Sequence, residues 1–300
     1  MVVTVLPLLL FLLPWASPNP APPPASLPLL RVTFLDVGQG DAAVIECPSG
    51  KIVVVDGGGR PGTDETWGGD PGTGVVVPYL RSRGISTVDL LVATHADDDH
   101  AQGLNAVAGR LGVRAALING YPGESAPYHR LLKRLRGKRV PLYIARRGQR
   151  LDLGAGARLE ILGPTDTPLL GGRSPSNNQS IVLRLVYGNS RFLFTGDAEQ
   201  EAESDLCGAP GLDLAAEVLK VGHHGSRWST SAPFLRAVHP GIAVISAGRA
   251  NSYGHPHREL MDRLRSRGVR VFRTDLQGAV TVETNGTALK VGTMQNRGKV

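Results

Sequence analysis

The stretch that decides the fold is THADDDHAQG, residues 94–103. It follows the apolar run VDLLVA (88–93), whose length and aliphatic composition are typical of a buried strand. The chain then places two histidines and three adjacent aspartates within six residues, namely His95, Asp97, Asp98, Asp99 and His100. Adjacent carboxylates repel one another and are costly to hold near a core. Their position therefore indicates either a cation-binding site or a solvated acidic loop with, at most, weak calcium affinity.

Polar clusters also follow four other predicted strands. They are Asp56-Gly57-Gly58, Gly196-Asp197, His223-His224-Gly225-Ser226 and Tyr253-Gly254-His255-Pro256-His257. Side chains at strand ends are held by a rigid scaffold and remain reachable from solvent. Imidazoles and carboxylates together are ligands for zinc, manganese or iron. The histidine clusters therefore favour a metal site over an acidic loop.

The spacing of residues 95–100 suits two ions. From a strand end, His95 and Asp97 can point to one side. Asp99 and His100 lie on the following turn, where they can face a second ion about 3.5–4 Å from the first. Asp197, at the end of its own strand, can bridge the pair. Two cations would explain why the carboxylates tolerate each other.

The rest of the chain predicts one large domain. With 300 residues it can bury a sizeable core. From Leu30 onward two strand-rich halves each carry helices, which predicts an α+β fold in the form of a layered αββα sandwich. We assign this single domain to residues 30–294 and a frayed tail to 295–300. The turn Pro-Ser-Gly at 48–50 predicts a hairpin.

The beginning of the sequence differs from the rest. Residues 1–17 are apolar and uncharged and resemble the apolar region of a signal peptide, or the tail of a longer membrane protein. Residues 18–29 form a proline-rich spacer. We expect an exported or membrane-associated protein on the extracytoplasmic face, with a cytoplasmic location as the alternative.

The charge balance is moderately basic. Lysine and arginine total 33 against 26 acidic residues, a net charge of +7, which favours a phosphate-bearing partner or reflects coding bias. The basic helical stretch at 128–139 is either a phosphate-contacting surface or a solvated helix. Cys47 and Cys207 match no metal or redox motif, and the sequence leaves open whether they pair. It also leaves the oligomeric state open.

Several motifs together carry a family resemblance. In order, they are FLDVGQGDAAVIE, VVVDGGG, THADDDH, NNQSIVLRL, FLFTGD, LKVGHHGS and NSYGHP. They resemble the metallo-β-lactamase superfamily and, more closely, the C-terminal hydrolase domain of ComEC-type DNA-internalisation competence proteins. The resemblance spans about residues 30–283 and implies a metallo-β-lactamase fold that binds two divalent ions, zinc or manganese.

The resemblance also implies the ligands. The family signature H-x-H-x-D-H becomes His95, Asp97, Asp99 and His100, with Asp97 in the place of the second histidine. Such a carboxylate would shift preference from zinc towards manganese or magnesium. The remaining implied ligands are Asp197 and His223, the better candidate of its pair.

One family histidine is missing between these motifs. His129 lies in the basic stretch, off the motif, whereas Asn178 or Ser180 occupies the matching place as a weak ligand or substrate contact, or as part of a turn. The resemblance implies that Asp41, Asp56 and Ser226 orient ligands or touch substrate. It implies catalytic roles for Asp99, His224 and His255, with His224 orienting a ligand or donating a proton, and His255 as a phosphate contact or proton donor. Asp98 should point outward and cap the next helix.

Three functions follow as hypotheses. The first is a binuclear phosphodiesterase or nuclease acting on DNA, together with a membrane DNA-uptake channel. The second is an exported metallo-esterase or phosphodiesterase acting on small molecules or wall polymers. The third is a non-catalytic domain that binds DNA or a channel partner, which the nearly complete ligand set disfavours.

Overall fold

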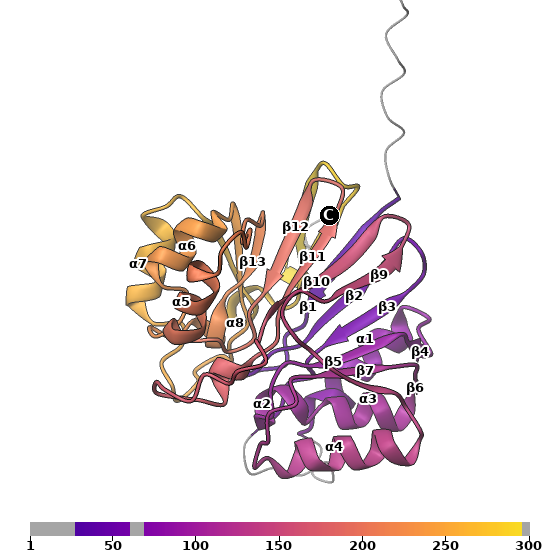
Figure 1. Ribbon diagram of the computed structural model, residues 1–300. Coiled ribbons are helices and arrows are strands. Elements are labelled where there is room, and N and C mark those ends of the chain that lie inside the picture. Colours follow the sequence, from indigo (N-terminus) through magenta and orange to yellow (C-terminus); the bar gives the residue numbers. More distant parts are fainter. Residues whose placement is uncertain (1–27, 61–68, 296–300) are drawn as a thin grey trace, which may run out of the picture.

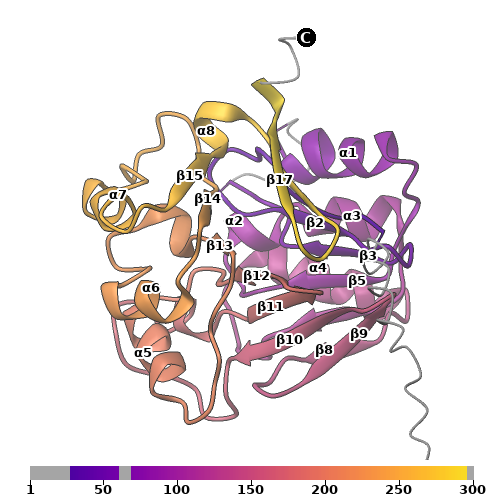
Figure 2. The same cartoon turned by 90° about the horizontal axis from the view of Figure 1, so that it is seen from above.

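The computed structural model of the protein describes residues 28–60 and 69–295. The segment predicted at 1–17, most of the spacer at 18–29 and most of the tail at 295–300 lie outside the described residues. Two sheets pack face to face, and helices cover both outer faces (Figures 1 and 2). This is the predicted αββα sandwich, in a single domain.

The first sheet holds the strands from both ends of the chain. Among the described residues its order is β17-β16-β1-β2-β3-β5-β7-β8. The strands are β1 (Leu30–Phe34), β2 (Ala43–Glu46), β3 (Ile52–Val55), β5 (Leu90–Ala93), β7 (Ala116–Ile118), β8 (Leu142–Ile144), β16 (Val280–Thr284) and β17 (Leu289–Thr293). The predicted hairpin is the antiparallel pair β2–β3. Strands β3, β5, β7 and β8 run parallel. Two short strands, β4 (Thr87–Val88) and β6 (Gly112–Val113), pair separately.

The second sheet is formed by the C-terminal half. Its order is β15-β14-β13-β12-β11-β10-β9 in the described part of the chain. The strands are β9 (Arg150–Gly154), β10 (Ala157–Gly163), β11 (Val182–Tyr187), β12 (Ser190–Phe194), β13 (Val218–Lys220), β14 (Ile242–Ile245) and β15 (Arg270–Arg273). Strands β12 to β15 run parallel. The carboxyl ends of parallel strands share one edge of each sheet, and the predicted polar clusters lie at that edge.

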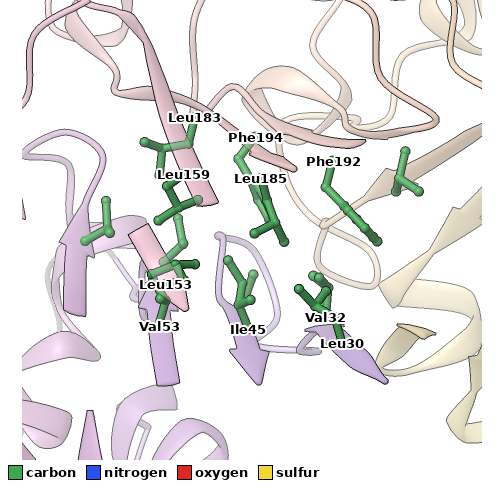
Figure 3. Close-up of a cluster of buried hydrophobic side chains, with 14 of the residues drawn as sticks. Leu30, Val32, Ile45, Val53, Leu153, Leu159, Leu183, Leu185, Phe192 and Phe194 are labelled. Carbon is green, nitrogen blue, oxygen red and sulfur yellow. The ribbon is translucent and has the colours of Figure 1, made fainter. Parts of the chain in front are cut away.

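The core lies between the two sheets. Figure 3 shows Val32, Ile45 and Val53 of the first sheet facing Leu185 and Phe194 of the second. Each of these side chains is at most 2% exposed. Burying one such side chain contributes roughly 1.5–3 kcal/mol. This inter-sheet core fixes the distance between the two strand edges that carry the polar clusters.

Amphipathic helices complete the outer layers. The first sheet is covered by α1 (Val77–Ser82), which continues a π-helical turn at Gly72–Val76, and by α3 (Leu104–Arg110) and α4 (Ala126–Gly137). The second is covered by α5 (Gln200–Gly208), α6 (Ala232–Val238) and α7 (Arg258–Arg265). Two single turns, α2 (Asp98–Ala101) and α8 (Thr274–Gln277), follow β5 and β15. Cys47 and Cys207 are both free.

Candidate metal centre

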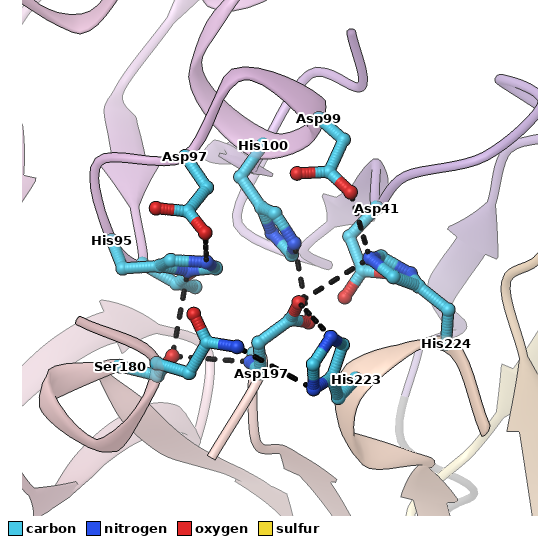
Figure 4. Close-up of polar contacts among 12 residues, drawn as sticks. Asp41, His95, Asp97, Asp99, His100, Ser180, Asp197, His223 and His224 are labelled. Atoms are coloured by element: carbon cyan, nitrogen blue, oxygen red, sulfur yellow. Dashed lines mark hydrogen bonds and ion pairs between the residues drawn. The ribbon is translucent and has the colours of Figure 1, made fainter. Parts of the chain in front are cut away.

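The polar residues after β5 divide into two pairs. His95 and Asp97 precede α2, and His95 Nε2 lies 3.6 Å from Asp97 Oδ2. Asp99 and His100 lie on α2 itself. The rings of His95 and His100 are 4.1 Å apart between centroids. The turn into α2 therefore brings the two histidines side by side while their neighbouring carboxylates lie apart (Figure 4).

Asp197 lies at the centre of the site (Figure 4). It follows β12 and is 2% exposed. Its Oδ1 lies 3.1 Å from His100 Nε2, and its Oδ2 lies 3.4 Å from His224 Nε2. Burial acts to raise the pKa of Asp197, but the charges of His100 and His224 outweigh burial and hold that pKa well below its usual range. Asp197 is therefore an anion that two imidazoles share.

His224 lies deeper in the site than His223, the member of the pair that the sequence favours as a ligand. His224 is 1% exposed, and its Nε2 lies 3.2 Å from Asp99 Oδ2. The side chain of His223 is 25% exposed, its Nε2 is 3.7 Å from Asp197, and its Nδ1 lies 3.0 Å from Glu199 Oε1. Both residues adopt left-handed backbone angles, with φ of 46° and 52°. This backbone turns His224, rather than His223, into the centre.

Two buried aspartates hold the histidine rings from behind. Asp56 Oδ2 lies 2.9 Å from His100 Nδ1, and Asp56 also accepts hydrogen bonds from the amide and hydroxyl of Thr94. Asp41 Oδ1 lies 3.1 Å from His224 Nδ1. A carboxylate at Nδ1 orients an imidazole and leaves Nε2 for a metal ion.

Asp41 is itself held by a buried cation. Asp41 Oδ2 lies 2.7 Å from Lys220 Nζ, at the end of β13, and Lys220 is 3% exposed. The ligand-type atoms of Asp41, His100, Asp197 and His224 all lie within 4.8 Å of one another. Because both Asp41 oxygens face other side chains, we assign Asp41 to orientation of His224 rather than to ligation.

The segment that replaces the missing family histidine contributes one side chain near the first pair. Ser180 Oγ lies 3.4 Å from His95 Nδ1 and accepts a hydrogen bond from the Asp197 amide at 3.1 Å. The other candidate, Asn178, lies in a 3₁₀ turn and does not face the centre, because its Oδ1 accepts from two amides at the start of α5. Its neighbour Asn177 approaches instead, with Nδ2 3.4 Å from His223 Nδ1. His129 is exposed on α4.

Several buried atoms at the centre have ion-pair contacts but no hydrogen bond to another described residue. They include His95 Nε2, His100 Nε2, His224 Nε2, Asp197 Oδ1 and Asp41 Oδ1. A buried polar atom without a partner is costly in a folded protein. Three imidazole nitrogens and a carboxylate oxygen that converge in this way are the donor set that zinc and manganese take. The residues therefore fit a metal centre.

A cavity of about 330 Å³ opens above these atoms. Its lining comprises Gln39, Asp97, Asp98, Asp99, Ser125, Asp197, His223, His224, Tyr253 and His255. His255, from the loop after β14, thus reaches the site. Asp98 was expected to cap α2, but Asp97 holds the N-cap position, and Asp98 accepts a hydrogen bond from Ser125 Oγ at 2.5 Å.

Ser226, another predicted site residue, has a local contact, and the basic stretch has one buried and one exposed face. Ser226 Oγ accepts a hydrogen bond from the Trp228 amide, which shapes the turn after His224. In the basic stretch, Leu131 and Leu135 of α4 are buried, whereas Lys133 and Arg136 are exposed.

Lys138, near the end of the basic stretch, contacts the neighbouring helix α3. Its Nζ donates hydrogen bonds to the carbonyls of Ala108 and Gly109 at 2.6 and 3.3 Å. Lys138 therefore satisfies the C-terminus of α3 rather than being directed to a phosphate.

Sequence reasoning missed three residues around the centre: Glu199, Lys220 and Asn177. Lys220 has a signal in the sequence, because a lysine inside the apolar strand EVLKVG needs a buried anion. Glu199 lies two residues after Asp197 and is buried. In the structure its carboxylate contacts His223. Asn177 has no signal that distinguishes it from Asn178.

Comparisons with known proteins find a family model and curated relatives. A profile described as Metallo-beta-lactamase superfamily matches residues 35–249. The chain is 32% identical over 258 residues to ComE operon protein 3 of Bacillus subtilis (strain 168), covering 83% of this chain and 32% of that protein. It is 34% identical over 251 residues to Competence protein ComA of Neisseria gonorrhoeae, covering 83% of this chain and 31% of that protein. The chain spans about a third of the length of these relatives.

Solved structures share the fold at low sequence identity. CmlA, a diiron beta-hydroxylase from Streptomyces venezuelae, gives a TM-score of 0.52 at 15% identity, covering 84% of this chain and 53% of that chain. Igni18, a metallo hydrolase from Ignicoccus hospitalis KIN4/I, gives a TM-score of 0.50 at 16% identity, covering 85% of this chain and 98% of that chain. Across residues 28–60 and 69–295, no helix combines the length and apolar character needed to cross a membrane.

Proposed function

The chain belongs to the metallo-beta-lactamase superfamily, and we propose that it is a hydrolase that uses two divalent metal ions to cleave phosphodiester bonds in DNA. The observation that carries the proposal is the position of Asp197. One of its oxygens lies 3.1 Å from His100 and the other 3.4 Å from His224. A buried carboxylate shared in this way is suited to bridge two ions.

His95 and Asp97 would hold one ion, and Asp99, His100 and His224 would hold the other. Asp197 would contribute to both sites. His223, a ligand in the sequence-based assignment, is left at the rim with Glu199. Zinc and manganese both suit this mixed set of nitrogen and oxygen donors, and the anionic oxygen of Asp97 favours the harder manganese relative to an all-histidine site.

The protein's own residues orient the ligand histidines and determine their protonation. When bound, two such ions lower the pKa of a water molecule and offset the charge that develops on a phosphoryl group. His100 and His224 present Nε2 to the centre because Asp56 and Asp41 occupy the Nδ1 side of each ring. Asp197 raises the pKa of His100 and His224 against the opposing effect of burial, so metal binding must displace protons from these rings.

DNA is the proposed substrate for two reasons. Two relatives are a ComE operon protein and a Competence protein, and the net charge of +7 favours a polyanion. Exposed Lys133 and Arg136 on α4 would supply phosphate contacts that position DNA without reading its sequence. We further propose that the protein acts on the extracytoplasmic face with a membrane DNA-uptake channel.

The test is metal-dependent hydrolysis by the purified protein. Metal content is measured first, and then cleavage of plasmid DNA, single-stranded DNA and bis-p-nitrophenyl phosphate with zinc or manganese. Asp197→Asn should lower the number of bound ions and reduce turnover by more than the roughly 10–100-fold typical of residues that only orient a ligand. The control is Asp166→Asn, at a side chain that is 92% exposed and pairs with Arg146.

Two outcomes would overturn the proposal. Near-normal turnover in metal-replete Asp197→Asn would show that a bridging carboxylate is unnecessary. Hydrolysis of esters or lactones, with no cleavage of phosphodiesters and no binding of DNA, would transfer the function to the metallo-esterase hypothesis.

A further inference from the structure

The amide of Gln39 connects two loops at the rim of the cavity. Its Oε1 accepts a hydrogen bond from the Gly248 amide at 3.0 Å. Its Nε2 lies 3.4 Å from His255 Nδ1. Because a backbone amide can only donate, it fixes which end of the Gln39 side chain is oxygen. The nitrogen end must then face His255 as a donor.

A donor at Nδ1 determines the tautomer of His255. In neutral imidazole one ring nitrogen carries the proton and the other accepts. If Nδ1 accepts from Gln39, the proton of His255 must lie on Nε2. His255 lines the cavity together with Asp197 and His224. Nε2 is therefore the ring nitrogen left to meet a substrate.

The loops that carry this contact are closely fitted. A Cβ on Gly248 would lie 2.7 Å from the backbone nitrogen of Gln39, so a side chain at position 248 would push the loops apart. Asn251 holds the backbone of His255 at both ends, with Oδ1 accepting from its amide at 3.0 Å and Nδ2 donating to its carbonyl at 2.7 Å. The ring of Tyr253 stacks on that of His255 at 5.7 Å between centroids. Such support fixes the ring before a substrate arrives.

The contact with Gln39 also sets the charge of His255. A ring nitrogen that accepts a hydrogen bond carries no proton, so His255 holds a single proton and is uncharged. It can donate a hydrogen bond, but it holds no second proton to release.

We propose that Gln39 is a positioning residue that holds His255 as the neutral Nε2–H tautomer, so that His255 donates a hydrogen bond to a phosphoryl oxygen of the substrate. The tautomer follows from contacts within the protein, whereas the identity of the acceptor rests on the proposed phosphodiesterase function. The sequence left two roles open for His255, phosphate contact and proton donation. This proposal selects the first.

The tautomer is tested directly by nuclear magnetic resonance of the zinc-loaded protein with ¹⁵N-labelled histidine. Long-range ¹H–¹⁵N correlations distinguish a protonated from an unprotonated ring nitrogen. We expect His255 to carry its proton on Nε2 across pH 6–8. In Gln39→Glu the carboxylate should draw a proton to Nδ1, whereas Gln149→Glu, at an exposed position, should leave the His255 signals unchanged. A wild-type proton on Nδ1, or an unchanged spectrum in Gln39→Glu, would overturn the inference.

Kinetics separate hydrogen-bond donation from proton transfer. Glutamine can place an amide N–H near the position of Nε2 but cannot act as an acid. His255→Gln should therefore retain at least 10-fold more phosphodiester turnover than His255→Phe, because losing one preorganised donor reduces turnover by about 10²–10³-fold. Equal loss in both variants would overturn the donor role. Absence of phosphodiester turnover in the wild type would instead overturn the proposed function, while the resonance experiment still decides the tautomer.

Discussion

Replacing Lys220 by methionine tests how strongly the buried ion pair between Lys220 and Asp41, beside the metal centre, stabilises the fold. The change removes the ammonium group that lies 2.7 Å from Asp41 Oδ2 but keeps a long apolar side chain in the strand. Asp41 is 5% exposed and would be left as a buried anion. Removing one partner of a buried pair is more damaging than removing both, because the remaining charge cannot be hydrated.

The expected magnitude follows from the electrostatics of Asp41. Burial acts to raise the pKa of Asp41, but Lys220 and His224 outweigh it and lower that pKa from 3.8 to about 2. A depression of this size corresponds to about 2.4 kcal/mol of stabilisation at neutral pH. Because the variant reverses this contribution, we expect Lys220→Met to reduce the free energy of unfolding by about 3–5 kcal/mol.

The pH dependence gives the prediction its sign. In the wild type, the folded pKa of Asp41 lies below its unfolded value, so this stabilisation is present above about pH 4 and is lost as the pH falls towards 2. Without Lys220, burial should raise the folded pKa of Asp41 above 3.8. The difference in stability between the two proteins should therefore be large at pH 7 and should shrink as the pH falls through about 4.

The assay is urea unfolding followed by circular dichroism at pH 7 and pH 4, with a chelator so that metal binding does not contribute. The double variant Lys220→Met/Asp41→Leu should recover much of the loss at pH 7, because it removes both charges. Lys290→Met, at an exposed lysine, is the control. A loss below about 1 kcal/mol at pH 7 that is also independent of pH would refute the reasoning, since a paired buried carboxylate cannot behave in this way.

Three further predictions test other parts of the molecule. Asp97→His should raise the zinc-to-manganese ratio in competitive loading at one pH, because a neutral nitrogen replaces an anionic oxygen; an unchanged ratio would show that Asp97 does not bind an ion. Neutralising Lys133 and Arg136 should flatten the slope of log DNA affinity against log salt by about 0.9 per lost phosphate contact, whereas neutralising Lys138, whose Nζ donates to carbonyls of α3, should not; equal slopes in all proteins would remove α4 from the DNA surface. Burial raises the pKa of Glu203 from 4.5 to about 7, so its contribution to stability is greatest below pH 4.5 and is lost as the pH rises through 7. In urea unfolding, Glu203→Gln should reduce the change in the free energy of unfolding across this pH range by up to about 3 kcal/mol. If the free energy of unfolding still falls as the pH rises, another group causes the pH dependence.

The interior strands could be predicted from the sequence, but two of the edge strands of the described sheets could not. The run LLVA (90–93) is continuous and apolar because β5 is buried on both faces. The edge strands β9 and β17 carry charged and half-exposed residues and lack that signal. Neither was predicted, although β17 closes the first sheet beside β16.

The site could be located from strand ends, but its orientation depended on backbone angles. His223 and His224 are adjacent, and their left-handed conformations decide which ring enters the centre. Asn177 and Asn178 lie in one 3₁₀ turn, where successive side chains diverge. Residue type and spacing are the same for either member of each pair. The sequence therefore identifies each pair of candidate residues, whereas the backbone conformation decides which residue of the pair faces the centre.

The three adjacent aspartates of THADDDH are tolerated because α2 begins among them. Their side chains point to different partners, namely His95 for Asp97, Ser125 for Asp98 and His224 for Asp99. The helical turn thus separates the carboxylates that sequence adjacency would bring together. For Asp99, the nearby imidazoles of His224 and His100 outweigh burial and lower its pKa, so the anion persists in the fold. The three adjacent carboxylates therefore point in different directions, and those of Asp97 and Asp99 face imidazoles of the metal centre.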